Sequence, residues 1–273
     1  MLSFNNIGNL GRLGNQMFQY AALLGISKHR GYEYTLPPNN LNHILLYDCF
    51  ELDNVNNKIS DWSSFQRISP KVHSFDKEFF NDCPENVDIL GFFQTEKYFS
   101  HIKDVIKKHY TFKKDIIIKT REQFNKLTFD NNIICLHVRL TDNVDHSIMK
   151  KVNFDYYKKA LSCFDKDIPV LIFSDDIESC MKQSLFFGSR FSFSESPNQF
   201  VDLCMMTMCK YHIISNSTFA WWGAWLSDSE KVIAPKKWYN DYVHDSEEWY
   251  EISQLRLWNP YDDGSVWESK DIC

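Results

Sequence analysis

The sequence predicts an α/β protein whose second half folds as a parallel β-sheet with helices on both faces. Two observations indicate this class. From about residue 133 onward, short apolar runs typical of buried strands alternate with longer segments whose apolar side chains recur at helical spacing. The 273 residues also suffice for one large domain or two smaller ones, and 44% of them are hydrophobic, enough to build real cores.

The N-terminal half carries fewer regular signals. Residues 16–28 place apolar side chains on one helical face, and the preceding GNLGRLGN predicts a tight loop leading into that helix. Residues 37–87 indicate no confident elements, whereas 88–93 predict a strand and 97–110 a helix. The polar stretch over 113–131 is the best candidate for a domain boundary.

In the second half, strands and helices alternate without a break. The expected strands are 133–138, 168–173, 190–193, 211–214 and 231–234, and the expected helices are 154–164, 177–187, 198–209 and 219–226. A parallel sheet binds ligands at the carboxyl ends of its strands. The residues that follow each strand are therefore the first candidates for a site.

The first of these strands runs into HVRLTD. Arg139 in this run is a permanent cation whose planar donor array suits phosphate oxygens. Alternatively, Arg139 is a structural arginine that pairs with Asp142 at the strand end. The spacing alone leaves both interpretations open.

Two further strand ends carry polar turns. Ser174 and Asp175 follow the second strand, where they either contribute to ligand binding or cap the next helix. The run SNST at 215–218 opens a helix, so it either binds an anion through hydroxyls and backbone N–H groups or simply caps that helix. A diphosphate between this turn and Arg139 would be held without a metal ion. Asp175-Asp176 is the nearest candidate for a metal-binding motif.

Composition and motifs argue against several classes of protein. The net charge is −6 and the basic residues are spread along the chain, unlike the basic face of a nucleic-acid-binding protein. The eight cysteines form no CxxC pair and have no zinc-like spacing, which favours buried free thiols. The glycine-rich loop at 8–14 matches neither the P-loop nor the GxGxxG pattern.

The N-terminus does not resemble a signal peptide, and no apolar run reaches the roughly 18–20 residues of a membrane span. We therefore expect a soluble, cytoplasmic protein, with peripheral association with a membrane left open.

Six segments occur in a fixed order over nearly the whole chain: GRLGNQMFQYA, GFFQTEKYF, CLHVRLTD, IFSDD, ISNSTFAWWGAWL and VIAPKKWY. In these segments and their order, the chain resembles the bacterial α-1,2-fucosyltransferases. STFAWWGAWL is the most specific of them. The resemblance implies a GT-B-like architecture of two Rossmann-like domains facing a cleft, an inverting mechanism, and GDP-fucose as donor without a metal cofactor. We expect an acceptor-side domain over 1–125 and a GDP-sugar-binding domain over 126–273.

The resemblance also implies roles for individual residues. Arg139 would bind the β-phosphate, and His137 would lie beside the nucleotide. Asp202 would accept hydrogen bonds from guanine N1 and N2, or it is an ordinary residue of its helix. The remaining candidates for substrate binding are Asn15, Gln16, Ser174, Asp175, Asn216, Ser217, Thr218 and Phe219. Of these, Ser217 and Thr218 would contact the diphosphate, and Asn15 and Gln16 would face the sugar or the acceptor.

The general base is the least defined role. Asp142 fills the acidic position of the family's HxRxxD pattern, where it either takes the proton of the acceptor hydroxyl or orients Arg139. Asp145 and Glu96 follow it as candidates, and late proton loss without a strong base is a further alternative. Family members usually carry a second arginine after the first. This chain has Leu140 at that position, so the supporting cation is missing.

Two other functions compete with this one. The first is a related transferase that uses another GDP-sugar or makes another linkage. The second is a nucleotide-sugar- or glycan-binding protein without catalysis, in which Trp221, Trp222 and Trp225 would form a lectin-like surface. Helical spacing favours the simpler interpretation that these tryptophans pack in a core.

Overall fold

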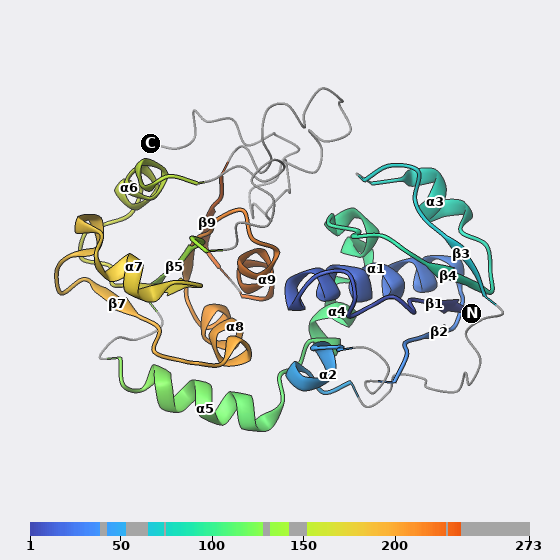
Figure 1. Cartoon of the computed structure of the whole chain (residues 1–273), viewed down its shortest axis with the longest axis horizontal. Helices are drawn as coiled ribbons and strands as arrows, with labels where there is room; N and C mark the ends of the chain where they lie inside the picture. Colours follow the sequence, from blue (N-terminus) through green and yellow to red (C-terminus); the bar gives the residue numbers. More distant parts are fainter. Residues whose placement is uncertain are drawn as a thin grey trace. The chain divides into compact units, whose positions relative to one another are not determined.

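The computed structural model describes residues 1–38, 43–52, 65–73, 75–127, 132–141, 152–227 and 229–235, which form two compact units (Figure 1). The first unit extends to Lys113 and the second begins at Lys114, ahead of the expected boundary at residue 126. The difference comes from α5 (Lys114–Phe124), a helix within the stretch that looked like a boundary. It packs against α8 (Gln199–Thr207) of the second unit, and its buried residues are Ile116, Thr120 and Phe124.

The first unit contains a parallel sheet in the order β2-β1-β4-β3. Its strands are β1 (Leu2–Ser3), β2 (Tyr34–Thr35), β3 (Gln66–Ile68) and β4 (Val87–Ile89). The helices described in this unit are α1 (Leu13–Arg30), α2 (Leu46–Cys49), α3 (Lys77–Asp82) and α4 (Lys103–His109), with 3₁₀ turns η1 (Glu96–Tyr98) and η2 (Ser100–Ile102). The strand order changes direction between β1 and β4.

Helix α1 confirms the helix expected at 16–28 and extends it at both ends. The loop before it turns at Gly11, whose φ of 87° favours glycine. A Cβ atom at Gly11 would lie 2.0 Å from the Asn15 side-chain nitrogen, so the loop can fold over the helix start only with glycine there. The helix ends at Gly31 in the left-handed conformation.

The segment expected as one helix over 97–110 is instead η1, η2 and α4. Tyr98 and Phe99 are consecutive and both fully buried, whereas neighbouring residues of a surface helix point in different directions. Gly25 of α1 permits this packing, because a Cβ atom there would lie 1.9 Å from the Tyr98 carbonyl oxygen.

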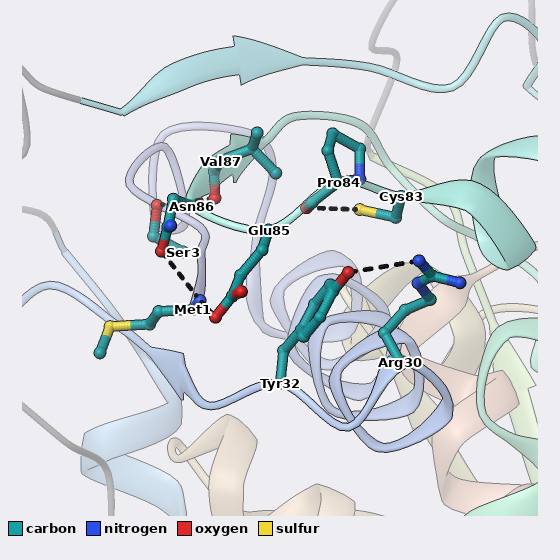
Figure 2. A network of polar contacts seen from close by, with 9 residues as sticks. All are labelled: Met1, Ser3, Arg30, Tyr32, Cys83, Pro84, Glu85, Asn86 and Val87. Carbon is teal, nitrogen blue, oxygen red and sulfur yellow. Dashed lines mark hydrogen bonds and ion pairs between the residues drawn. The ribbon is translucent and has the colours of Figure 1, made fainter.

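A polar network fastens the beginning of β1 to the segment before β4 (Figure 2). The Met1 amine donates hydrogen bonds to the side chains of Glu85 at 2.9 Å and Asn86 at 3.1 Å. Close by, the Arg30 guanidinium at the end of α1 donates to the Tyr32 hydroxyl at 3.2 Å. The two Met1 contacts tie the central strands β1 and β4 together at their amino ends.

The second unit contains a parallel sheet in the order β7-β6-β5-β8-β9. Its strands are β5 (Ile134–Val138), β6 (Val170–Ser174), β7 (Phe191–Phe193), β8 (Tyr211–Ile213) and β9 (Lys231–Ile233), which confirm all five expected strands. The other helices are α6 (Phe154–Ser162), α7 (Ile177–Met181) and α9 (Thr218–Leu226), and a 3₁₀ turn η3 (Ser184–Phe186) follows α7. The chain builds outward from β5 to β6 and β7, then returns to place β8 on the other side of β5. The topological switch point, where such sheets bind ligands, therefore lies between β5 and β8.

The tryptophans of α9 belong to the core of the second unit. Trp221 and Trp222 are fully buried, Trp225 is nearly so, and their rings contact one another. They therefore do not form a lectin-like surface. The seven cysteines in the described part of the chain are free and six of them are buried, as expected. None of the described helices is long and apolar enough to cross a membrane.

Candidate active site at the β5–β8 switch point

A side-chain hydrogen bond crosses the switch point of the second unit. His137 Nδ1, near the end of β5, lies 2.8 Å from the Oγ of Ser215, which follows β8. Both residues are buried. The imidazole also lies beside Phe219 in the first turn of α9, with ring centroids 6.3 Å apart. The bond therefore joins the carboxyl ends of the two central strands and sets His137 against the start of α9.

Two influences keep the His137 imidazole neutral. Burial, and secondarily the positive charge of Arg139, lower its pKa to about 4, while the Asp175 carboxylate opposes them. At neutral pH one ring nitrogen is therefore a donor and the other an acceptor. His137 can contribute a hydrogen bond at this site, but not a second positive charge.

The loop after β5 is held by Asp175, which follows β6. The two oxygens of this carboxylate accept hydrogen bonds from Leu140 N at 2.7 Å, Thr141 N at 3.1 Å and Thr141 Oγ1 at 2.8 Å. Leu140, which occupies the position of the usual second arginine, packs against the apolar core of the unit. The two residues after Arg139 are therefore held in place. Asp175 bonds both of them, and the apolar core also contacts Leu140.

The neighbouring polar residues have capping roles. Asp176 begins α7 by accepting a hydrogen bond from Ser179 N at 3.0 Å, and Ser174 Oγ accepts one from Asp176 N at 3.0 Å. The helix-capping interpretation therefore applies to Asp176, whereas Asp175 holds the Arg139 loop.

The start of α9 is the second part of the site. Ser217 caps the helix, with its Oγ 3.5 Å from the donor Ala220 N, and Ser217 N donates to the Ser215 carbonyl at 2.8 Å. Asn216 and Ser217 are buried, while Thr218 and Phe219 are partly exposed. No acidic residue lies in the first turn of this helix. Its backbone N–H groups and positive dipole end therefore favour an anion at the sheet edge.

Asp202 lies in the first turn of α8, which follows β7. Its carboxylate accepts a hydrogen bond from Ser194 Oγ at 2.5 Å. Burial raises the pKa of Asp202 to about 6, and the Ser194 bond opposes that shift. Further hydrogen-bond donors from a ligand would stabilise the ionised form of this half-buried carboxylate.

The candidates in the first unit differ in environment. Asn15 Oδ1 accepts a hydrogen bond from Gln94 Nε2 at 2.8 Å, which joins the start of α1 to the loop after β4. Gln16 is fully buried, its Nε2 donates to the His43 carbonyl at 3.2 Å, and its Oε1 accepts from Leu45 N at 2.8 Å. Gln16 thus joins the helix start to the His43–Leu45 segment from the interior of the unit. Both residues stay predictions for the site.

The remaining predicted residues are placed as follows. Asp142 and Asp145 lie outside the described residues. Glu96 begins η1 and is partly exposed. Across the described ranges, no group of three or more His, Cys, Asp or Glu side chains could hold a metal ion.

Sequence reasoning placed Ser215 in the turn after a predicted strand, but it missed the hydrogen bond to His137. It also missed Thr141 and Gln94 as members of these networks. The partners of all three residues depend on strand order and packing, for which a single sequence carries no signal.

The sequence of the chain matches a known protein family. A family model described as glycosyl transferase family 11 matches residues 2–258. The chain belongs to glycosyl transferase family 11. It is accordingly a glycosyltransferase, and the resemblance stated from its motifs is confirmed at the level of the family.

Curated relatives of this family 11 member include three named transferases. An α-1,2-colitosyltransferase of Escherichia coli is 28% identical and covers 89% of this chain and 97% of the relative. The O-antigen biosynthesis glycosyltransferase WbnK of Escherichia coli is 27% identical, over 59% of this chain and 60% of the relative. Galactoside α-(1,2)-fucosyltransferase 1 of Bos taurus is 22% identical, over 81% of this chain and 66% of the relative. The chain thus spans slightly under two thirds of the length of the last two.

Solved structures share the fold of this family 11 chain. NodZ α-1,6-fucosyltransferase soaked with GDP-fucose has a TM-score of 0.53 at 12% identity, covering 83% of this chain and 92% of that one. NodZ from Bradyrhizobium gives a TM-score of 0.52. POFUT1 in complex with GDP gives a TM-score of 0.50 at 13% identity, covering 85% and 97%. The likeness establishes a GT-B-like α/β fold, as the resemblance implied.

Proposed function

We propose that this glycosyltransferase moves L-fucose from GDP-fucose to a hydroxyl of a glycan acceptor, galactose O2, with inversion at the anomeric carbon. One observation carries the proposal. At the β5–β8 switch point, Arg139 follows one central strand and the capped start of α9 follows the other. A guanidinium and a helix start on one edge suit a diphosphate. Relatives named as α-(1,2)-fucosyltransferases support the choice of sugar and linkage.

In this proposal the groups at the switch point stabilise the leaving GDP. GDP gains negative charge as the glycosidic bond breaks, and Arg139 and the N–H groups at the start of α9 would stabilise that charge electrostatically. No metal ion is then needed. His137, neutral through its lowered pKa, would donate or accept one hydrogen bond beside the nucleotide. Asp202 would accept hydrogen bonds from the two adjacent donors of guanine.

The acceptor hydroxyl must lose its proton as it attacks the anomeric carbon. We assign that proton to Asp142, which directly follows Thr141 in the chain, and place Asp145 second. Asn15, together with Gln94, would face the sugar or the acceptor. The nucleotide-binding domain would thus supply both leaving-group stabilisation and the base.

A second candidate donor is favoured by one relative. The α-1,2-colitosyltransferase of Escherichia coli matches this chain over nearly its whole length. Colitose differs from fucose in lacking the hydroxyl at C3, so a GDP-linked colitose would present the same nucleotide to the same switch point. The two donors would be distinguished by contacts to that single hydroxyl.

Transfer assays with both donors and a panel of galactose-terminated acceptors test the proposal, with NMR to assign the product linkage. We expect an α-fucosyl group on galactose O2. A kcat/KM higher for the colitosyl donor by more than about tenfold, or 1.4 kcal/mol, would replace fucose with colitose. GDP binding without transfer or donor hydrolysis would indicate a binding protein instead.

The same assay tests metal independence. We expect unchanged turnover in excess EDTA, because protein groups alone would stabilise the leaving diphosphate. Activity that disappears with EDTA and returns with Mn²⁺ would contradict this part of the proposal.

A further inference from the structure

Asp175 connects two neighbouring strands at the point where the candidate phosphate-binding arginine follows β5. β5 and β6 are in register, with Val138 opposite Ser174. Arg139 and Asp175 are therefore the next residues along the two strands. The Asp175 carboxylate uses both oxygens on the loop that follows Arg139 and accepts three hydrogen bonds of 2.7 to 3.1 Å from Leu140 and Thr141.

Two consecutive backbone N–H groups directed at one carboxylate fix the course of the chain. Hydrogen bonds to an ionised acceptor are stronger than neutral ones, and two from adjacent residues restrict the backbone between them. From the other side, the Leu140 side chain packs against the apolar core. The segment Arg139–Thr141 is thus held between a carboxylate and an apolar anchor, in a chain that lacks the second arginine usual in its family.

We infer that Asp175 is a positioning residue for donor binding: it fixes the loop that carries Arg139 and so presets the guanidinium for the diphosphate. The inference rests on the proposed function. It assigns Asp175 a role through Arg139 instead of through contact with the substrate. A prepositioned arginine loses less conformational entropy when the diphosphate binds, which increases affinity without any new contact.

Charge and positioning predict opposite effects for removal of this carboxylate. Asp175 places a negative charge near the proposed site of a negatively charged ligand. If charge alone mattered, Asp175→Ala would strengthen GDP binding. If Asp175 acts by holding the loop, the same change weakens GDP binding. The sign of the change therefore separates the two accounts.

The adjacent aspartate supplies a matched control. Asp176 leaves the same strand end, but its carboxylate caps α7 through Ser179 N. Asp176→Ala removes the same charge one residue away and loosens a different segment. It therefore reproduces any general effect of lost charge or lost stability without releasing the Arg139 loop.

The experiment is calorimetric titration of the full chain with GDP. We expect Asp175→Ala to weaken GDP binding about tenfold, as for loss of one charge-assisted interaction, and Asp176→Ala to stay within about twofold of wild type. Thr141→Val, which removes one of the three bonds at an exposed residue, should weaken binding about threefold, whereas Thr141→Ser should not. These smaller changes keep the test valid if Asp175→Ala folds poorly.

A double mutant provides the decisive readout. In an Arg139→Ala background, Asp175→Ala should cause no further loss of GDP affinity, because the group it positions is gone. Tighter or unchanged binding in Asp175→Ala, or full additivity with Arg139→Ala, would overturn the inference while leaving the proposed function intact. Wild-type protein that does not bind GDP would overturn both.

Discussion

The two sheets each join their central strands by a polar bond at the switch point, but the two bonds differ in charge. In the first unit the Ser3 hydroxyl of β1 donates to the Asp88 carboxylate of β4 at 3.2 Å. That carboxylate also accepts from Asn5 N at 2.7 Å and from Arg67 Nε at 2.9 Å. Arg67 therefore forms an ion pair with the same carboxylate that joins the two strands.

In the second unit the crossing bond contains no carboxylate. His137 and Ser215 are joined at 2.8 Å, and the lowered pKa of His137 keeps the pair neutral. The nearby carboxylate, Asp175, accepts its hydrogen bonds from the backbone and hydroxyl of the neighbouring loop. Arg139 follows β5 at this edge, and the backbone N–H groups of α9 begin just after β8.

The comparison suggests two separate contributions. The doubly wound sheet provides the position of a site, and the charge of the side chains that join its central strands favours one kind of ligand over another. A buried carboxylate at the switch point disfavours a diphosphate, whereas a neutral pair beside a guanidinium favours it. Our proposal accordingly assigns the glycan acceptor, which carries no charge at its reacting hydroxyl, to the first unit. It assigns the nucleotide diphosphate to the second.

The largest expected effect concerns the proton acceptor. Asp142→Asn should lower kcat about 10²–10⁴-fold and leave GDP affinity nearly unchanged if Asp142 is the base, because the amide cannot take the proton. If Asp142 orients Arg139 instead, GDP binding should weaken together with turnover. Steady-state kinetics combined with GDP titration distinguish the two. A variant within about threefold of wild type in both measurements would remove Asp142 from the mechanism and direct the same test to Asp145.

The next effect tests the two arginines against each other. Arg139→Ala should weaken GDP binding by about 1.5–3 kcal/mol, or roughly 10- to 150-fold, as a charge-assisted contact is lost. Arg67→Ala should leave GDP affinity unchanged. It should cost about 1–2 kcal/mol of unfolding free energy, because the nearly buried Asp88 carboxylate loses a partner.

Calorimetry and thermal unfolding measure both quantities for this pair. Equal losses of GDP affinity in the two variants would contradict the contrast between the switch points. Wild-type affinity in Arg139→Ala would count decisively against the proposed donor site.

The two units also differ in how well their strands can be predicted from the sequence. β5 is five consecutive buried residues, a run long enough to recognise from apolar composition alone. β1 and β2 have two residues each, too few for any periodicity. They are strands because α1 packs over them and brings distant segments into register, which is a tertiary effect.

The site divides similarly between local and long-range features. The places of Arg139 after β5 and of Ser217 at the start of α9 could be predicted, because the sequence itself defines those elements. The Asp175 bonds to Leu140 depend on the register of β5 and β6, and the burial of Gln16 depends on packing of a distant loop. Such contacts can be inferred only once the order of the strands in the sheet is known.

A pH-dependent effect of intermediate size concerns Asp202. Burial raises its pKa from the ordinary 3.8 to about 6, so ionisation of the carboxylate costs folding free energy. The associated stability is fully present below pH 3.8 and is lost as the pH rises through 6. Asp202→Asn, which stays neutral, should therefore be more stable than wild type at pH 8, by about 1–3 kcal/mol, with the difference shrinking toward pH 5.

Binding should change in the opposite direction. If the Asp202 carboxylate accepts two guanine hydrogen bonds, Asp202→Asn should bind GDP about tenfold more weakly at pH 8, because its amide places a donor against a donor. At pH 5 wild type is itself largely protonated, so the two proteins should converge. A stabilised variant with unchanged GDP affinity at pH 8 would identify Asp202 as an ordinary residue of α8.

The smallest effect bears most directly on the two crossing bonds. Ser215→Ala removes the partner of His137 Nδ1 in a fully buried setting, and an unsatisfied buried nitrogen costs about 1–2 kcal/mol of unfolding free energy. Because His137 lies against the first turn of α9, we also expect GDP binding to weaken about threefold.

Ser3→Ala is the matched change in the first unit. Asp88 keeps Asn5 N and Arg67 as donors, so the stability loss should be smaller, about 0.5–1 kcal/mol, and GDP affinity should not change. Chemical denaturation and GDP titration of the two serine variants decide the matter. If Ser3→Ala lowers GDP affinity as much as Ser215→Ala does, the nucleotide is sensitive to both sheets alike, and the assignment of the diphosphate to the neutral crossing bond is wrong.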